Sequence, residues 1–189
     1  MNLTQPIRNP KDVRKFLNYF KNQGQTRNYV LATFGVHSAL RISDILNLNT
    51  NDVYDFKNKT INENIIITEQ KTKKTQELAL NKTIISALKA YFPQAKPNTP
   101  LILNPKTGKS ISRIQAHRII SNAAKQAGLT QKVSCHSLRK TFGYHAWKKG
   151  ISPAVIMAVY NHSSMATTQT YLSIIQDDKN TAYLGLEFL

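Results

Sequence analysis

The sequence has little of several features that define whole classes of proteins. Its 189 residues include one cysteine, Cys135, which excludes an internal disulfide and a zinc site built on cysteine pairs. No apolar run approaches the ~18 residues that suggest a membrane span, and the N-terminus lacks a signal-peptide pattern. The five histidines show no HExxH-like pairing. We therefore expect a soluble cytoplasmic protein without a bound metal.

Acidic residues are also scarce. Ten Asp and Glu residues stand against 26 Lys and Arg residues, which gives a formal net charge of +16 at pH 7. This excess favours a nucleic acid as partner, because phosphate contacts supply both affinity and fast encounter. The alternative is a ribosome-like or merely solubilising basic surface. The length and a hydrophobic fraction of 41% indicate a single globular domain with an ordinary core.

The first forty residues predict two helices. Asn9 and Pro10 suit the N-cap and the first position of a helix that ends at Gly24. The basic residues on its polar faces could lie on a DNA backbone or form a solvated face. A second helix, capped by Thr26 and continuing to Ala39, is apolar nearly all round and is expected to be buried.

A single charge, Arg41, then stands among apolar neighbours. Ser43 suits the N-cap of a third helix, with Asp44 in its first turn. Arg41 would then lie in the turn just before that helix, where an unpaired charge is costly. Its expected partner is Asp44 or a bound anion.

The stretch from Val53 to Leu80 is rich in β-branched residues separated by polar turns, which predicts short antiparallel strands. One turn carries Lys71, Lys73 and Lys74, so the tip of a hairpin would be a cluster of lysines. Such a tip can place an ammonium group beside a phosphate; alternatively, the lysines protect an edge strand from aggregation. Helices return after this stretch, and the predicted fold class is α+β, mainly α-helical with a small antiparallel sheet.

The residues best suited to chemistry lie near the C-terminal end. His136 and Arg139 are three positions apart, one helical turn, so both can point into one site. Arginine can grip a phosphate through two parallel hydrogen bonds, and histidine can move a proton near neutral pH. His162 follows, and Tyr171 comes nine residues after it. A tyrosine hydroxyl becomes a nucleophile once activated, so these residues are suited to breaking a phosphodiester.

The order of these motifs resembles the catalytic domain of the tyrosine site-specific recombinases, the phage-integrase family. The resemblance covers roughly residues 10 to 175, and its strongest part is the nine-residue interval between His162 and Tyr171. The motifs that carry it are, in order, Leu40-Arg41-Ile42-Ser43-Asp44, a lysine in a β-turn, His136-x-x-Arg139, and Asn161-His162-Ser163-Ser164-x-x-Thr167-Thr168-x-x-Tyr171.

The resemblance implies a tyrosine recombinase catalytic fold and a DNA strand transesterification that needs no metal, ATP or other cofactor. Arg41 and Arg139 would clamp the scissile phosphate and stabilise its transition state. Tyr171 would attack phosphorus, which gives a 3′-phosphotyrosyl link and a free 5′-hydroxyl. The outcome would be integration, excision or inversion.

The resemblance also assigns the remaining site residues. His136 would act as a base or orient the phosphate, and His162 would donate a further hydrogen bond to it. Lys71 would protonate the leaving 5′-oxygen, with Lys73 and Lys74 of the same hairpin as alternatives. His117, Tyr144 and the other histidines are expected to be structural or surface residues, and Cys135 a buried small residue.

The chain departs from the family in two places. Asn161 stands where members usually have glycine, and asparagine also tolerates positive φ. Members usually carry a separate N-terminal DNA-clamping domain, for which 189 residues leave no room. We expect one catalytic domain over residues 1–189, either a complete short recombinase, which Met1 favours, or part of a longer chain.

The resemblance implies further partners. They are double-stranded DNA, copies of the chain (a dimer on each site and a tetramer in synapsis) and accessory DNA-bending proteins, so the protein would associate with the nucleoid. The tail over residues 177–189, acidic at its start and apolar at its tip, would be exchanged between subunits. Two other functions stay open. One is relaxation of DNA by the same chemistry, as in type IB topoisomerases. The other is DNA binding or regulation by a protein that keeps the fold without catalysis.

Overall fold

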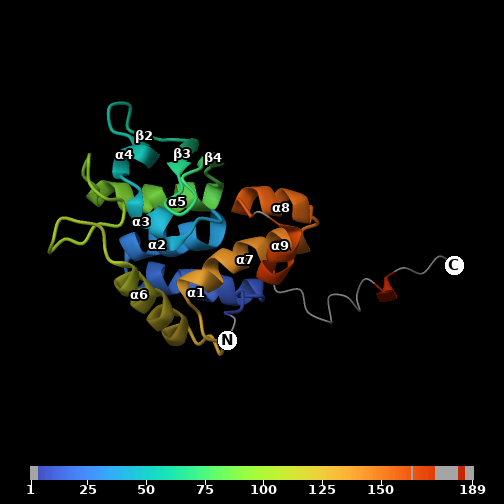
Figure 1. The fold of residues 1–189 in the computed structure, drawn as a ribbon. Helices are drawn as coiled ribbons and strands as arrows, with labels where there is room; N and C mark the ends of the chain where they lie inside the picture. Colours follow the sequence, from blue (N-terminus) through green and yellow to red (C-terminus); the bar gives the residue numbers. More distant parts are fainter. Residues whose placement is uncertain (1–3, 163, 173–182, 186–189) are drawn as a thin grey trace.

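The computed structural model describes residues 4–162, 164–172 and 183–185 (Figure 1). The helices are α1 (Pro10–Asn22), α2 (Thr26–His37), α3 (Ile42–Asn47), α4 (Thr50–Val53), α5 (Lys82–Tyr91), α6 (Arg113–Gln126), α7 (Cys135–Lys148), α8 (Pro153–Tyr160) and α9 (Met165–Leu172), with a 3-10 turn, η1 (Phe92–Gln94), after α5. The strands are β1 (Tyr54–Asp55), β2 (Thr60–Ile61), β3 (Asn64–Thr68) and β4 (Thr75–Ala79). The predicted α+β class is confirmed.

The β residues form two separate antiparallel hairpins rather than one sheet. Strand β1 pairs with β2, and β3 pairs with β4 in a register that places Ile65 opposite Leu78. The prediction of a single small sheet was wrong because β1 and β2 are only two residues long, too short to extend a ladder to the second hairpin. In the second hairpin, Ile65 and Ile67 are buried and face the helices, while Ile66 points to solvent.

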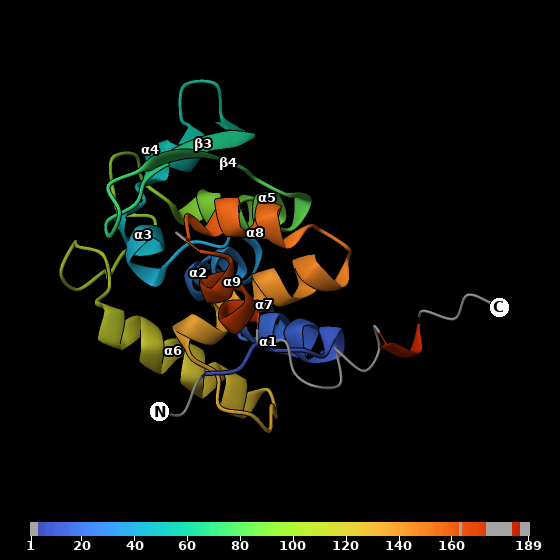
Figure 2. The same cartoon turned by 45° about the vertical axis from the view of Figure 1, so that its right-hand side comes forward.

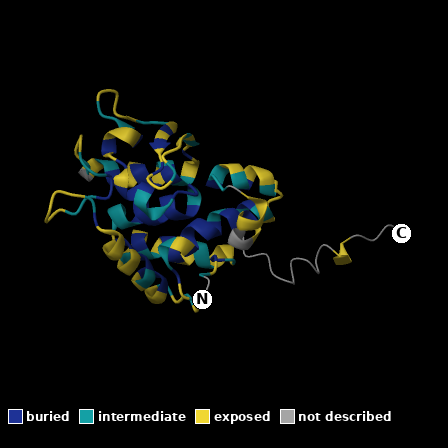
Figure 3. Ribbon diagram, in the orientation of Figure 1, coloured by how far each residue is buried: buried dark blue, intermediate teal, exposed yellow. Residues whose placement is uncertain are grey.

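Helix α2 lies at the centre of the molecule (Figures 1 and 3), and all its residues from Tyr29 to Val36 are buried. Helices α1, α5 and α7 pack around it. Gly35 allows α7 to come close, since a Cβ added at this position would lie 2.7 Å from Leu138 Cδ1 and 3.2 Å from Leu138 Cβ. The central helix therefore fixes the place of α7.

Two clusters of apolar side chains hold the fold together. The larger one contains residues of all six helices from α1 through α6, of the hairpin β3–β4 and of the start of α7. Its members Phe16, Phe34 and Leu88 expose no surface. The second consists of four buried residues around α8, namely Ala39, Ala146, Ile156 and Tyr160, with Phe142, Trp147 and Val159 packed against it. Among the described residues, the cluster that attaches α8 is thus smaller than the one that holds the rest of the fold.

The predicted cap Asn9 is confirmed, and Asn81, Ser112 and Ser152 cap three other helices in the same way. In each case the side chain accepts a hydrogen bond from a backbone N–H of the first turn, which satisfies a donor that the helix itself leaves unpaired. Among the described helices, none is long and apolar enough to cross a membrane.

Two predicted caps were wrong. Thr26 is the first residue of α2 rather than its cap, because Gly24, at φ +63°, turns the chain so sharply that the helix begins at once. Ser43 lies inside α3, whose N-cap is Arg41 in an extended conformation. The helix begins at Ile42 rather than after Ser43. The reason is that Arg41, just before it, is held by a contact of its side chain with the distant Glu69 rather than by local capping.

Candidate active site

A cleft of about 760 Å³ brings four of the predicted site residues together: Arg41, Lys71, His136 and Arg139. They come from the start of α3, the turn of the hairpin β3–β4, and α7. The other described residues that line the cleft are Thr4, Ile42, Ser43, Gln70, Arg113, His117, Ser134 and Cys135. The four described lining residues that carry a charge at neutral pH, Arg41, Lys71, Arg113 and Arg139, are all basic, which suits a phosphate.

Arg41 is paired with Glu69 at the end of β3. Its Nη1 lies 2.7 Å from Glu69 Oε2, and Glu69 exposes no surface. The expectation that Asp44 would be the partner was wrong, whereas binding of an anion stays a prediction. Asp44 instead accepts a hydrogen bond from the backbone N–H of Gln70, at 2.9 Å. The hairpin β3–β4 folds back onto the start of α3. Glu69 and Asp44 therefore each join these two segments, which are far apart in the sequence.

Glu69 has several partners besides Arg41. The Thr72 hydroxyl donates to its Oε2 at 2.6 Å, and the Gln76 amide donates to its Oε1 at 3.4 Å. Burial acts to raise the pKa of the Glu69 carboxyl, but these hydroxyl and guanidinium donors lower it below its ordinary value. The buried amide of Asn161 also acts in this direction, although its Nδ2 makes no regular hydrogen bond. Glu69 is therefore charged at neutral pH.

Arg139 is almost fully buried, with 3% of its surface exposed. Its guanidinium donates hydrogen bonds to the carbonyl oxygens of Ala39 and Tyr160, the latter at 3.1 Å. The guanidinium also lies over the Tyr160 ring, 4.6 Å from its centroid, and the Tyr160 hydroxyl donates to the Arg139 carbonyl at 2.6 Å. Ala39 adopts a left-handed conformation, with φ +57°. The arginine is thus held in a fixed orientation by neighbours on two other segments.

His136 lies in the first turn of α7, which begins with a capping box between Ser134 and Ser137. Its side chain is exposed to the cleft. Partial burial lowers the pKa of His136, and the charges of Arg139, Lys140, Arg41 and Lys71 lower it further. The imidazole is therefore neutral at pH 7 and can accept a proton.

His162 follows the residue that ends α8. Asn161 has φ +52°, which confirms that it replaces glycine in a left-handed turn. The His162 ring stacks on Tyr160 with centroids 5.0 Å apart, and its Nδ1 lies 3.1 Å from the Thr168 hydroxyl. Burial, followed by the charges of Arg139, Arg41 and Lys71, lowers the pKa of His162 to about 4. His162 is not among the described residues that line the cleft, but its ring lies against Tyr160, which holds Arg139.

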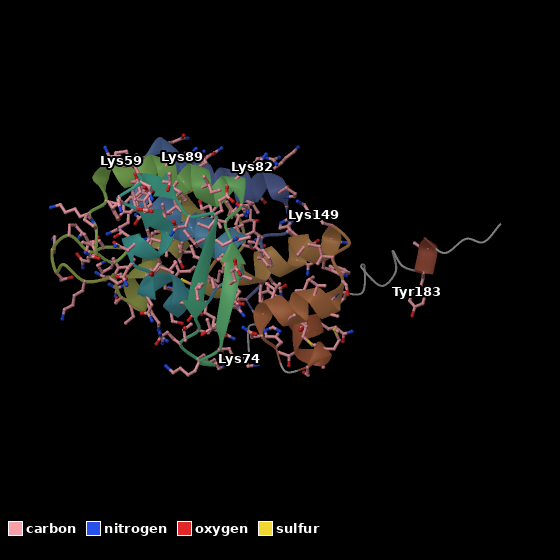
Figure 4. All side chains as sticks on the ribbon, turned by 90° about the horizontal axis from the view of Figure 1, so that it is seen from above. Lys59, Lys74, Lys82, Lys89, Lys149 and Tyr183 are labelled. Atoms are coloured by element: carbon pink, nitrogen blue, oxygen red, sulfur yellow. The ribbon has the colours of Figure 1, made fainter. Side chains whose placement is uncertain are left out.

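The three lysines of the hairpin turn differ in position. Lys71 lines the cleft, and its charge contributes to the lowered pKa values of both His136 and His162. Lys73 and Lys74 are not among the described residues that line the cleft. Lys74 lies at the end of the hairpin, at the edge of the molecule (Figure 4). The geometry favours Lys71 among the three candidates.

Tyr171 lies near the end of α9, but its side chain is outside the described part of the structure, as is most of the tail over residues 177–189. Helix α9 packs against both α7 and α8 (Figure 2). The predicted nucleophile is therefore carried by a helix in contact with those that carry Arg139 and precede His162.

Three residues of the site were not identified from the sequence, namely Glu69, Ala39 and Tyr160. The available signals were weak: Glu69 is a carboxylate next to a lysine-rich turn, and Tyr160 directly precedes Asn161-His162. His117 was expected to be a surface residue; it is exposed and lines the cleft. Cys135 was expected to be a buried small residue; it is half-buried and lines the cleft, and burial raises the pKa of its thiol to about 11. Among the described residues, no group of three His, Cys, Asp or Glu side chains is arranged to hold a metal ion.

Comparisons with known proteins bear on the family of this chain. Residues 8–177 match the model of the phage integrase family. The chain is 38% identical over 183 residues to the probable integrase/recombinase YoeC of Bacillus subtilis, and the match covers 97% of both chains. It is 31% identical over 147 residues to the tyrosine recombinase XerC of Thermodesulfovibrio yellowstonii, covering 72% of this chain but only 46% of XerC.

Solved structures show the same fold. The crystal structure of XerA recombinase matches 97% of this chain with a TM-score of 0.78 and 20% identity, and 66% of that chain is covered. The XerH site-specific recombinase bound to a palindromic difH substrate matches 97% of this chain with a TM-score of 0.76 and 20% identity, and 53% of that chain is covered. This chain thus spans about half to two thirds of the recombinases of known structure that it resembles.

Proposed function

This chain belongs to the phage integrase family of tyrosine recombinases, and we propose that it cleaves and rejoins DNA strands through a phosphotyrosine intermediate. The observation that supports this most directly is the convergence of Arg41 and Arg139, from opposite halves of the chain, on one cleft with Lys71 and His136. Two guanidinium groups, an ammonium group and an imidazole match the needs of a phosphodiester whose negative charge grows as it is attacked.

The two arginines would bind the non-bridging oxygens of the scissile phosphate. Each guanidinium has five N–H donors in a planar fork that matches the oxygens of a phosphate. Arg41 gives one bond to Glu69 and keeps other donors for an anion. Because protein groups fix both guanidinium planes before DNA binds, little reorganisation is needed in the transition state.

Proton transfer would be divided between the neutral and the charged groups of the cleft. His136, which is neutral at pH 7, would accept the proton of the attacking hydroxyl or hydrogen-bond to the phosphate. Lys71 would donate a proton to the leaving 5′-oxygen. His162 would donate a hydrogen bond to a phosphate oxygen from Nε2; for this the Thr168 hydroxyl must donate to Nδ1, 3.1 Å away, rather than to the Ser164 carbonyl, 3.4 Å away.

Tyr171 would be the nucleophile. Its oxygen forms a bond to phosphorus while the bond from phosphorus to the 5′-oxygen breaks, which leaves a 3′-phosphotyrosyl link and a 5′-hydroxyl. A 5′-hydroxyl of another strand can then attack the link and release the tyrosine. The number of phosphodiester bonds is unchanged, so the exchange needs no external source of energy.

A suicide substrate tests the proposal. Nicked duplexes of random sequence would be incubated with the protein, and covalent adducts would be isolated on a denaturing gel and sequenced to identify the target. We expect an adduct with the wild type, none with Tyr171→Phe, and an unchanged amount with Tyr183→Phe, since Tyr183 is an exposed tyrosine of the tail. An adduct with Tyr171→Phe would show that the nucleophile is misassigned. Sequence-selective binding without any adduct would favour the DNA-binding alternative.

Double-stranded DNA would lie across the cleft and along α6. Arg113 and His117 of this helix line the cleft, and Ile114, on the same exposed turn, is 66% exposed. A basic helix with an exposed apolar side chain suits a groove, where it can contact both phosphates and base edges. Since its substrate would be chromosomal DNA, the protein would act at the nucleoid.

We also propose that the tail over residues 177–189 docks on a second copy of the chain. A pocket of about 560 Å³ between α1, α2 and α7 has an apolar floor that includes Leu17 and Phe142, and His145 and Lys149 on its rim. An acidic segment with an apolar tip complements such a pocket in both respects. Removing the residues after Asp177 should abolish recombination and leave DNA binding unchanged. Full recombination by the truncated chain would contradict this docking.

A further inference from the structure

Glu69 has no part in the reaction outlined above, yet it lies at the centre of the contacts beneath the cleft. Among the described residues it is the one acidic side chain that exposes no surface. Its carboxylate is 2.7 Å from Arg41 Nη1 and 2.6 Å from the Thr72 hydroxyl, so it joins the start of α3 to the turn of the hairpin β3–β4. A buried charge needs such partners, and these also make its geometry specific.

The backbone of Glu69 closes the same turn. Its N–H donates to the Lys74 carbonyl at 2.9 Å, and its carbonyl accepts from the Lys73 N–H at 2.9 Å. Lys73 has φ +58°, a left-handed conformation that a residue other than glycine keeps only where its surroundings enforce it. The turn that carries Lys71 is therefore held by Glu69 through both side chain and backbone.

We propose that Glu69 is a positioning residue, which fixes Lys71 relative to Arg41 so that the ammonium group reaches the leaving oxygen while the guanidinium binds the same phosphate. This inference rests on the proposed function. Lysine is a long, flexible side chain, and a turn that projects into solvent would leave it in many positions. The Glu69 carboxylate binds both the turn and Arg41. It therefore sets the distance of the Lys71 ammonium group from the leaving oxygen and that of the Arg41 guanidinium from the phosphate.

The proposal predicts a defect specific to the leaving group. A 5′-thiolate leaves without needing a proton, so a substrate with sulfur at the bridging 5′ position does not depend on the lysine. Cleavage of the normal phosphate by Glu69→Ala should be slower by about 100-fold, the scale expected for a displaced catalytic group. On the sulfur substrate the loss should be clearly smaller, since it then comes only from the loosened Arg41 guanidinium. Glu69→Gln, which keeps one acceptor oxygen, should show the same pattern with a smaller loss.

Glu77 of β4 supplies the matched control, because it is an exposed carboxylate on the same hairpin. Glu77→Ala and Glu77→Gln should cleave both substrates at the wild-type rate. Arg41→Ala should lose the same factor on both substrates, since phosphate binding is needed in either case. An equal loss on both substrates by the Glu69 variants would overturn the proposal, as would an unchanged rate on the normal phosphate.

A measurement without DNA separates this inference from the proposed function. In Glu69→Gln, the Lys73 amide should exchange its hydrogen faster than in the wild type and in Glu77→Gln, because the turn has lost a charged anchor. If the wild type forms no adduct on either substrate, the proposed function fails, and the exchange rates still decide whether Glu69 holds the turn. Unchanged exchange at Lys73 would contradict the positioning role.

Discussion

The phosphate-binding region and the region that carries the proposed nucleophile are built differently. Arg41 belongs to a segment packed on the large core around α2, and its guanidinium is held by Glu69. Arg139 lies on α7, which also packs on that core, but its guanidinium is held by Ala39 and Tyr160 of the small cluster. Among the described residues, that small cluster is also where α8 is attached. Among the described side chains of α9, only Thr168 is buried.

This difference separates two requirements of the reaction. Groups that stabilise charge work best when they are already oriented, and a large core supplies that rigidity. A segment with few buried residues opens at a smaller cost in free energy than the body it is attached to. We therefore expect Arg41 to be oriented before DNA arrives, and the orientation of Arg139 and the position of α9 to depend on the small cluster as well.

The largest expected effects concern the two cores. Leu88→Ala in α5 and Ile156→Ala in α8 both truncate fully covered side chains, at 0% and 1% exposure. Leu88→Ala should lower the free energy of global unfolding by about 2–5 kcal/mol. Ile156→Ala should mainly accelerate hydrogen exchange in α8 and α9, with a smaller shift of the global transition. Denaturant unfolding and native-state hydrogen exchange measure the two effects. If Ile156→Ala lowers the free energy of global unfolding as much as it lowers the stability of α8 and α9, the regions form one cooperative unit.

The next effect concerns Arg139. Arg139→Lys keeps the charge but cannot reach the carbonyls of Ala39 and Tyr160 together while also binding a phosphate. Adduct formation should fall by about 100- to 1,000-fold, as for the loss of a transition-state donor. Arg27→Lys is the matched control, since Arg27 is also partly buried and donates to a carbonyl, that of Leu103, away from the cleft. A comparable loss in Arg27→Lys would mean that the effect comes from stability.

A smaller effect is expected where α7 crosses α2. In Gly35→Ala, the new methyl group would meet Leu138, the residue before Arg139, at 2.7 Å. Overpacking of this kind costs about 1–3 kcal/mol. The same substitution should cost less in a Leu138→Ala background, because the clash is removed, and a double-mutant cycle measured by thermal unfolding gives the coupling. Additive effects would show that α7 shifts to make room.

The smallest effect is the pH dependence of His162. Its pKa in the folded protein is about 4, below the ordinary value of about 6.5 expected for the unfolded chain. The unfolded state therefore binds more protons, so this group's contribution to stability is present above about pH 6.5 and is lost as the pH falls towards 4. Titration of the ring by NMR should give the low value, and His162→Gln should reduce the loss of stability on acidification. A ring pKa near 6.5 would contradict this.

The parts of the fold predicted from the sequence are those governed by local rules. The cap residues Asn9 and Asn81, the buried helix α2 and the left-handed Asn161 follow from backbone preferences and hydrophobic periodicity. The convergence of Arg41, His136 and Arg139 was expected from a family resemblance rather than from their spacing. Local rules alone do not bring α3 and α7 together.

What could not be predicted depends on contacts between distant segments. The partner of Arg41 is Glu69, 28 positions away, and it was missed because nearby Asp44 offered a local alternative. The carbonyls that hold Arg139 belong to Ala39 and Tyr160, and backbone acceptors leave no trace in the residue types. The groups that orient a site are thus harder to recognise in a sequence than the groups that act in it.

The single cysteine has a practical consequence for spectroscopy. Cys135 lines the cleft, and its raised pKa of about 11 keeps the thiol protonated and slow to react at neutral pH. One substitution, Cys135→Ser, gives a background without cysteine. Pairs of new cysteines on exposed positions such as Lys74 and Val155 could then carry dyes or spin labels. The measured distance between a label on the hairpin and one on α8 would report how the two regions move when DNA binds.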